Sequence, residues 1–356
     1  MSYHSPKTDN AAQLDAAGKH DEAINELSLA TMEGDLQAMT QLGKRLLVGD
    51  RAPYLAQDGA GLVLDAAQKD CPEAVATLCI FQCTGVFQRK SWEDALRTLT
   101  HAACLGWMPA REQLLLLSRE PVVGDLQQLI ASGDKGYWLQ LAQNLDINFW
   151  LKVPEGKVLS DSPRVVSFAD FIPESWCRLF IRQAASKLKP ALVYDAGNKR
   201  NFRSQTRTNS IAEFNLVEND FIHFLLQERM SKACGVPMVH MEGTAILNYQ
   251  PGEEISNHYD FVDPKLPNYQ QEIAENGQRI ITFLIYLNDD YEGGETVFPE
   301  VGLRNKGKTG EGLYFVNALP DGSADLRALH AGAPPQSGQK WIVSQFIRNR
   351  PVKYIL

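Results

Sequence analysis

Residues 242–261 read EGTAILNYQPGEEISNHYDF. The run TAILNY at 244–249 is rich in residues typical of β-strands, and a Pro-Gly turn follows it. The chain then reaches His258 and Asp260, at what we interpret as the end of a second strand. Because residues two apart in a strand point to the same face, His258 and Asp260 are expected to face one interior, with Tyr259 turned away.

The rest of this half of the chain also indicates short strands. β-type runs separated by Gly, Asp and Asn turns occur at 279–288, 312–319 and 340–347. A strand-like run at 164–172 precedes two helical runs, at 173–188 and 219–235. This pattern predicts a β-sandwich or jelly-roll barrel with flanking helices.

A third metal ligand is available downstream. A mononuclear Fe(II) site with two histidines and one carboxylate needs one more histidine, and His330 is the only histidine after Asp260. Lys340 begins the 340–347 run, and a cation inside a barrel is costly unless it meets an anion. The distal carboxylate of 2-oxoglutarate would be that anion. Tyr286, and Tyr249 from the neighbouring strand, would reach the same cosubstrate.

In sequence order, these pieces resemble the prolyl 4-hydroxylase branch of the Fe(II)/2-oxoglutarate dioxygenases. The matching stretches are RTNS at 207–210, residues 242–261, RIITFLIYLNDDYEGGETVFPE at 279–300 and HAGAPPQSGQKW at 330–341. The resemblance implies a double-stranded β-helix over roughly 164–350. It implies that iron is held by His258, Asp260 and His330. It implies cosubstrate positions at Tyr249, Tyr286 and Lys340, with Thr282 and Thr296 as further candidates.

The residues expected around the substrate depart from that family's pattern. The resemblance places Arg207 near the substrate peptide. The family usually carries an aromatic residue where this chain has Ile255, and a tryptophan where it has Phe346. These two positions put the identity of the substrate in question, and they leave the predicted iron site unchanged. The retained carboxylate, Asp260, favours hydroxylation over halogenation.

The first half of the chain repeats with a period of 36 residues. Small residues recur at Ala38, Ala74 and Ala110, and a turn position recurs at Gly34, Asp70 and Gly106. Such a period predicts a stack of helix pairs, each burying one face against the next. The stretch AMTQLGKRLLVGD at 38–50 resembles the Sel-one-like branch of the tetratricopeptide repeats.

We therefore predict a multidomain α and α+β protein, in which an N-terminal α-solenoid of helical repeats precedes a double-stranded β-helix (jelly roll) with flanking helices. The repeat domain is expected at 1–150, a linker at 151–163 and the dioxygenase domain at 164–356. The segment at 263–278 lies between the predicted ligands and the next strand, where it would form a lid over the site.

Composition excludes several other classes of protein. The 356 residues carry a formal net charge of −8, which argues against a nucleic-acid-binding surface. The sequence has no apolar run long enough for a membrane helix and no secretory signal at its start. Its 6 cysteines form no CxxC pair. We expect free thiols and a cytoplasmic location.

The resulting hypothesis is a hydroxylase that uses Fe(II), 2-oxoglutarate, O2 and ascorbate to modify a prolyl residue in a peptide or protein. The repeat domain would engage that peptide or protein. Three alternatives remain: the same chemistry on another residue or a small molecule, a repeat-based binding or scaffold protein with a regulatory oxygenase domain, and a metal-dependent hydrolase. Lys340 and the complete set of ligands disfavour the last two.

Overall fold

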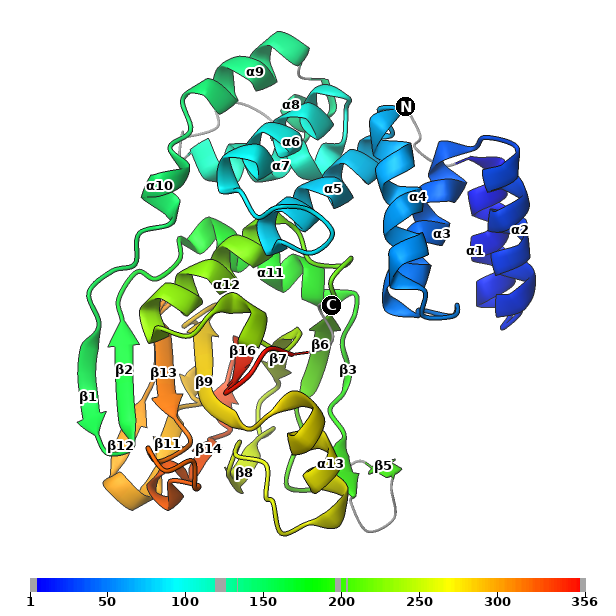
Figure 1. The fold of residues 1–356 in the computed structure, drawn as a ribbon. Helices are drawn as coiled ribbons and strands as arrows, with labels where there is room; N and C mark the ends of the chain where they lie inside the picture. Colours follow the sequence, from blue (N-terminus) through cyan, green and yellow to red (C-terminus); the bar gives the residue numbers. More distant parts are fainter. Residues whose placement is uncertain (1–4, 119–125, 133, 196–199, 203, 353–356) are drawn as a thin grey trace. The chain divides into compact units, whose positions relative to one another are not determined.

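The computed structural model describes residues 5–118, 126–132, 134–195, 200–202 and 204–352. The chain forms two compact units (Figure 1). The first unit contains the described residues up to Leu151 and, in addition, Asn215–Leu225. The second contains Lys152–Phe214 and the described residues from Leu226 onward. Among the helices in the described ranges, none is long and apolar enough to cross a membrane.

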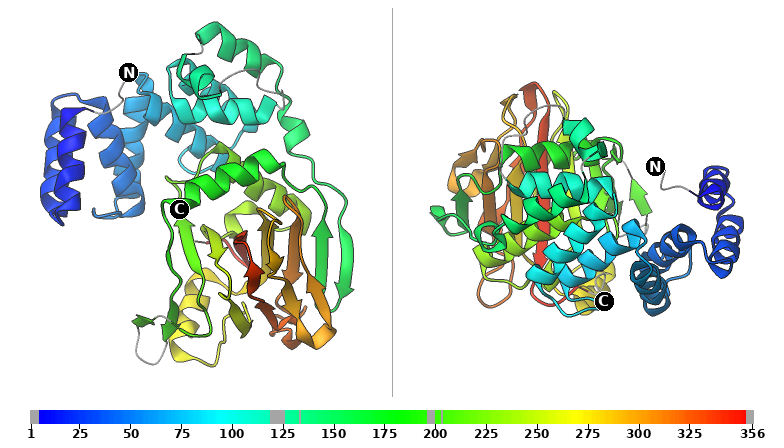
Figure 2. Two further views of the ribbon diagram at one scale, coloured as in Figure 1. Left: turned by 180° about the vertical axis from the view of Figure 1, so that it is seen from behind. Right: turned by 90° about the horizontal axis from the view of Figure 1, so that it is seen from above.

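Helices make up the first unit, and as far as Ser132 each helix in the described ranges packs against the next one (Figure 2). They are α1 (Pro6–Ala16), α2 (His20–Met32), α3 (Leu36–Val48), α4 (Ala56–Gln68), α5 (Pro72–Thr84), α6 (Trp92–Cys104), α7 (Met108–Ser118), α8 (Leu126–Ser132), α9 (Lys135–Gln143) and α10 (Ile147–Trp150).

The structure confirms the predicted repeat. Helices α3, α5 and α7 begin at residues 36, 72 and 108, and α2, α4 and α6 begin at residues 20, 56 and 92. Ala38, Ala74 and Ala110 are fully buried. Gly34, Asp70 and Gly106 all have positive φ angles, of 90°, 58° and 98°. The repeated small residues therefore lie where helices touch, and the repeated turn residue adopts the left-handed conformation that ends a helix.

The second unit is built on a large antiparallel sheet with strand order β1-β2-β13-β9-β16-β7-β6-β3. Its strands are β1 (Lys157–Asp161), β2 (Arg164–Phe168), β3 (Lys189–Pro190), β6 (Ser210–Phe214), β7 (Thr244–Tyr249), β9 (Arg279–Tyr286), β13 (Gly312–Val316) and β16 (Lys340–Arg348).

A smaller four-stranded sheet, with order β12-β11-β14-β8, faces the large one. Its strands are β8 (Ile255–His258), β11 (Thr296–Phe298), β12 (Leu303–Asn305) and β14 (His330–Gly332), and two short pairs are formed by β4 (Val193–Asp195) with β5 (Arg200–Phe202) and β10 (Glu292–Gly293) with β15 (Pro335–Ser337). Phe298 from the small sheet packs with Leu247, Leu284, Leu313 and Ile342 from the large one. Two antiparallel sheets around one apolar core form the predicted jelly roll.

The helices that precede β7 in this half of the chain cover the outer face of the large sheet. The helices of the second half are α11 (Glu174–Ala185), α12 (Phe221–Cys234) and α13 (Pro267–Asn276), with short 3-10 turns η1 (Met238–His240), η2 (Pro299–Val301) and η3 (Leu326–Ala328). Gln227 of α12 donates to Thr244 and Gln345, which alternate with the core-facing residues of β7 and β16. The opposite, inner face of the sheet is left for the site.

Two boundaries differ from the sequence-based expectation. Residues 157–161 of the expected linker form β1, which pairs with β2 as a hairpin. The Pro and Ser residues that indicate a linker are here the turn of that hairpin. In addition, the start of α12 packs with the repeats: the Phe221 amide donates to Gln113 Oε1 at 3.0 Å, and the Phe221 ring meets Trp92 edge-on.

Candidate metal centre

Two neighbouring strands of the small sheet, β8 and β14, bring His258, Asp260 and His330 together, as the sequence predicts. His258 ends β8, His330 begins β14, and the two are cross-strand partners. His258 Nε2 lies 3.4 Å from Asp260 Oδ1, and His330 Nε2 lies 3.4 Å from Asp260 Oδ2. One ligand atom from each residue lies within 4.8 Å of the others. This is the donor set of a two-histidine, one-carboxylate iron site.

Backbone carbonyls fix the orientation of both imidazoles. His258 Nδ1 lies 2.9 Å from the carbonyl oxygen of Ser256, and His330 Nδ1 lies 3.0 Å from that of Ala328. When Nδ1 donates to a carbonyl, the neutral ring keeps its lone pair on Nε2. Both lone pairs are then directed at the space beside Asp260, where a metal ion would bind.

The site is closed on one side and open on the other. The Asp260 and His330 side chains are each 7% exposed, and the His258 side chain is 34% exposed. Burial alone would raise the pKa of Asp260. When no metal is bound and Nε2 of each ring carries a proton, the charge of His330 and hydrogen bonds from both histidines hold the pKa of Asp260 well below its usual value. The carboxylate therefore stays ionised, and a substrate would approach from the side of His258.

Lys340 is a buried cation in the same interior. It is 1% exposed, and its ammonium lies 5.2 Å from the ring centroid of Tyr249 and 5.7 Å from that of Tyr286. Among the residues that the structure describes, no acceptor forms a hydrogen bond or ion pair with this ammonium. Burial lowers the pKa of Lys340 to about 8, an effect that the charge of Glu295 opposes. An anionic ligand would provide the Lys340 ammonium with a partner of opposite charge.

Thr282 and Thr296, the two further cosubstrate candidates, lie in different parts of the site. Thr296 Oγ1 lies 2.8 Å from the Tyr286 hydroxyl, so it belongs with the residues around Lys340. Thr282 instead donates to Asp260 Oδ2 at 2.6 Å. The structure therefore places Thr282 beside the metal ligand, and the cosubstrate role that the resemblance implies for it stays a prediction.

The expected substrate residues lie at the rim of the interior. Arg207 forms a backbone bridge with Ile255, and its Nε is buried without a hydrogen-bond partner among the described residues. The charge of Arg207 acts on the pKa of both Tyr249 and His258, which places its side chain near the site. Ile255 is half-buried against the core. Phe346 is also half-buried, as the cross-strand partner of Thr282 in β16.

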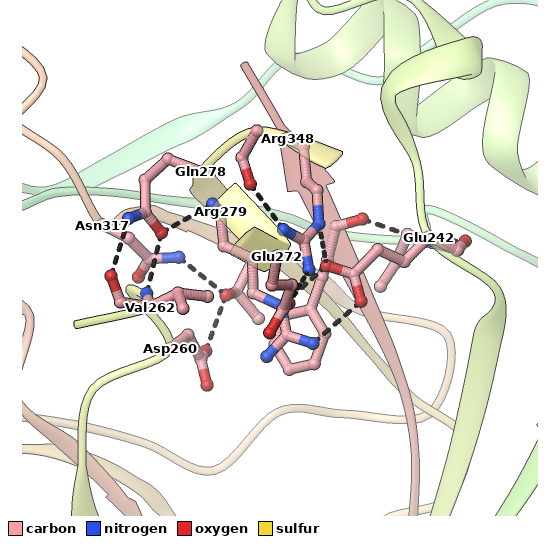
Figure 3. A network of polar contacts seen from close by, with 12 residues as sticks. Glu242, Asp260, Val262, Glu272, Gln278, Arg279, Asn317 and Arg348 are labelled. Carbon is pink, nitrogen blue, oxygen red and sulfur yellow. Dashed lines mark hydrogen bonds and ion pairs between the residues drawn. The ribbon is translucent and has the colours of Figure 1, made fainter. Parts of the chain in front are cut away.

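Sequence reasoning missed a charged network at this end of the site (Figure 3). Arg279 donates from Nε and Nη2 to Glu242 at 2.7 and 2.8 Å, and its guanidinium carbon lies 3.8 Å from the centroid of the Phe346 ring. Arg348, which is 1% exposed, bonds both Glu242 and Glu272. A charged residue at the end of a strand usually indicates solvent, so the sequence carries no signal of these buried pairs.

Contacts of the same network hold the segment predicted to form a lid. Residues 263–278 contain α13, and Arg348 bonds both Glu272 and the carbonyl of Gly277. Arg350 donates to the carbonyl of Ala274 at 3.0 Å. The end of the segment nearest β9 is therefore anchored to the large sheet, and closure of the remainder over the site stays a prediction.

Comparison with known proteins gives the same result as the geometry. Residues 244–348 match the family model of the 2OG-Fe(II) oxygenase superfamily. Probable prolyl 4-hydroxylase 9 of Arabidopsis thaliana is 32% identical over 215 residues, covering 54% of this chain and 72% of that protein. The prolyl 4-hydroxylase subunit alpha-1 of Gallus gallus is 29% identical over 190 residues, covering 53% of this chain and 36% of that protein.

Two solved structures align with parts of the chain. The viral collagen prolyl hydroxylase of Paramecium Bursaria Chlorella virus-1, in complex with 2OG, aligns with a TM-score of 0.40 and 24% identity, covering 53% of this chain and 98% of that one. A Sel1 repeat protein of Oxalobacter formigenes aligns with a TM-score of 0.30 and 18% identity, covering 41% of this chain and 60% of that one.

Proposed function

This chain belongs to the 2OG-Fe(II) oxygenase superfamily, on its prolyl 4-hydroxylase branch, and from that premise we propose that it hydroxylates a prolyl residue in a peptide or protein. It is a 2-oxoglutarate-dependent dioxygenase. The observation that carries the proposal is that a complete ligand set, His258, Asp260 and His330, shares one interior with the buried ammonium of Lys340, which has no acceptor bonded to it among the described residues.

The residues present fit both the metal and the cosubstrate. His258, Asp260 and His330 supply two neutral nitrogens and one ionised carboxylate, which suits Fe(II). Lys340 supplies the charge for the distal carboxylate of 2-oxoglutarate, and the buried rings of Tyr249 and Tyr286 enclose it. When bound, Fe(II) and 2-oxoglutarate supply the oxidising chemistry: 2-oxoglutarate becomes succinate and CO2, and the atoms of O2 end in succinate and in the new hydroxyl group.

This chain's own residues act by binding, orienting and excluding water. The carbonyls of Ser256 and Ala328 orient the two imidazoles, and the apolar core beneath the ligands keeps water from that side. The exposed side of His258 leaves room for a substrate C–H bond. We expect ascorbate to sustain turnover by keeping the metal reduced, and the cytoplasmic location expected from the sequence stays part of this proposal.

The repeat unit offers a polar cavity for a protein partner. The cavity has a volume of about 270 Å³ and is lined by α3, α5 and a turn ahead of α12, through Gln41, Lys44, Arg45, Val48, Asp50, Glu73, Asn215, Val217 and Glu218. Lysine, arginine and carboxylate side chains together would suit peptide groups of either charge. We assign capture of the substrate protein to this unit.

One observation favours a second substrate class. The guanidinium of Arg279 covers a face of Phe346, at the position where the resemblance to the prolyl 4-hydroxylase branch leads us to expect tryptophan. Because the Arg279 guanidinium occupies this face of Phe346, the same face is not available to pack against a proline ring. The same oxygenation of another side chain, or of a small molecule with an acceptor for Arg279, is the alternative.

The two substrate classes can be separated by mass spectrometry. Purified protein is incubated with Fe(II), 2-oxoglutarate, ascorbate and a mixture of peptides that do or do not contain proline. We expect a gain of one oxygen atom on proline only, together with succinate. Succinate without any modified peptide, or oxygen on another residue, would contradict the prolyl assignment and favour the alternative.

A further inference from the structure

A buried chain of hydrogen bonds ends on the carboxylate ligand. The Thr282 hydroxyl donates to Asp260 Oδ2 at 2.6 Å, and Asn317 Nδ2 donates to Thr282 Oγ1 at 2.9 Å (Figure 3). Thr282 is 1% exposed and Asn317 is 2% exposed. Neither residue coordinates the predicted metal, and neither is used in the function proposed above.

The residues at the two ends of this series of hydrogen bonds, Asp260 and Asn317, determine which groups donate and which accept. An ionised carboxylate only accepts, so the Thr282 proton must be directed at Asp260. The Thr282 oxygen is then free to accept, and the amide nitrogen of Asn317 only donates. If the Asn317 amide were turned over, its oxygen would compete with Asp260 for the same proton. The arrangement seen is the one that satisfies Thr282 and Asp260 together.

Asn317 is held in place by its own backbone. Its amide donates to the carbonyl of Ile280 at 2.8 Å, and its carbonyl accepts from the amide of Asp325 at 3.0 Å. Asp325 caps η3, the turn whose Ala328 carbonyl orients His330. Asn317 is therefore connected to two of the three ligands: to Asp260 through Thr282, and to His330 through the turn that follows.

The main chain beyond Asp260 is clamped separately. Gln278 accepts from the amide of Val262 and donates to its carbonyl, both at 2.7 Å. This clamp fixes the backbone but leaves rotation of the Asp260 carboxylate free. The hydrogen bond from Thr282 restrains that rotation.

We propose that Thr282 and Asn317 are positioning residues, which direct one hydrogen bond to Oδ2 and so hold the Asp260 carboxylate in the orientation that binds metal. This inference rests on the proposed function, because it concerns the same metal site. Residues that support a ligand in this way typically change metal affinity by about 10–100-fold.

The test uses isosteric variants of the full-length chain and titration with Co(II), followed by calorimetry and by the absorbance of bound Co(II). Thr282→Val removes the donor and keeps the shape, and we expect Co(II) affinity to fall at least about tenfold. Thr282→Ser keeps the hydroxyl, and we expect most of the affinity to return. Thr100→Val, at a buried threonine that bonds its own helix in α6, is the matched control.

Asn317→Asp provides a second, independent variant. Its carboxylate would attract the Thr282 proton away from Asp260, so we expect a loss of affinity as large as that in Thr282→Val although the shape is unchanged. Melting temperatures of the metal-free proteins check that each variant folds. Wild-type affinity in both Thr282→Val and Asn317→Asp overturns the inference while leaving the proposed function intact. Failure of the wild-type protein to bind Co(II) overturns both.

Discussion

His258 and His330 lie directly opposite each other on two antiparallel strands, with ring centroids 4.2 Å apart. Asp260 and Lys340 are 80 positions apart in the sequence. In the fold, β8, β14 and β16 converge on one interior. The pairing of β8 with β14 is therefore what assembles the site, since it brings the third ligand to the first two.

Loss of either histidine should abolish metal binding while leaving the fold intact. We expect His258→Ala and His330→Ala to lose Co(II) affinity by more than the roughly 100-fold that loss of a supporting residue causes. His101→Ala, at a half-exposed surface pair with Asp70, is the control and should bind as the wild type does. Equal binding in His330→Ala and the control would contradict the assignment of the third ligand.

Binding of 2-oxoglutarate should depend on the charge of Lys340. Burial lowers the pKa of this group to about 8, so the free protein loses the positive charge as the pH rises above that value. A bound carboxylate favours the charged form, so the affinity for 2-oxoglutarate should fall above about pH 8, approaching about tenfold per pH unit. Calorimetric titration with 2-oxoglutarate in the presence of Mn(II), repeated at several pH values, measures this affinity.

Two variants at this position separate charge from shape. Lys340→Arg keeps its charge at every accessible pH and should remove the fall in affinity above pH 8. Lys340→Met should bind 2-oxoglutarate weakly at every pH. A wild-type affinity that is the same on both sides of pH 8 would show that Lys340 does not hold the cosubstrate.

The buried network around Glu242 should contribute to stability. Burial would raise the pKa of Glu242, but the charges and hydrogen bonds of Arg279 and Arg348 lower it. Arg348→Met leaves Glu242 with Arg279 as its one arginine partner in this network and removes the Arg348 bond to Glu272, and we expect a loss of about 1–3 kcal/mol in the free energy of unfolding. Arg178→Met, in an exposed pair with Glu174, should cost about 0.5 kcal/mol or less.

The same network gives a pH dependence with a defined sign. Because the folded protein lowers the pKa of Glu242, its contribution to stability is present above the ordinary value of 4.5 and is lost as the pH falls through the lower folded value. The difference in stability between wild type and Glu242→Gln should therefore shrink in acid. Urea unfolding at neutral and acidic pH measures it, and a difference that grows in acid would contradict this account.

Two glycines of one helix test the packing of the repeats. A Cβ at Gly59 of α4 would lie 2.6 Å from the Gly43 carbonyl oxygen, whereas a Cβ at Gly61 would meet nothing within 4 Å. We expect Gly59→Ala to lower the free energy of unfolding by about 1–3 kcal/mol. Gly61→Ala should raise it by about 0.5–1 kcal/mol. Equal effects in thermal unfolding would show that α3 and α4 do not pack as closely as described.

The sequence was sufficient to predict both architectures and the pair His258 and Asp260, because these depend on local rules. His330 was assigned from the family resemblance and as the one histidine after Asp260. A repeat period places Ala38 and Ala74 at equivalent helix contacts, and strand alternation places His258 and Asp260 on one face. The strands at β7, β9, β13 and β16 were predicted within a few residues of where they lie. Short-range periodicity carries this information directly.

The sequence could not predict the side-chain hydrogen bonds between different strands, because these depend on which side chains face each other in the folded sheets. Thr282 has the spacing of a cosubstrate residue, and only the paired strands show that its hydroxyl meets Asp260. The bonds from Asn317 to Thr282 and from Arg348 to Glu242 join distant parts of the chain. The hairpin of β1 with β2 was hidden for a related reason, since turn residues have the same composition in a linker and in a hairpin.

The most direct test of the central claim is oxygen transfer measured with isotopically labelled O2 gas. Wild-type protein and Asp260→Ala are each supplied with Fe(II), 2-oxoglutarate and a proline-containing peptide, with Asp321→Ala, at a surface turn, as the matched control. We predict that the wild type and Asp321→Ala place label in both succinate and the hydroxylated peptide, and that Asp260→Ala forms neither. Labelled succinate from Asp260→Ala at the wild-type rate, or none from the wild type, would contradict the account.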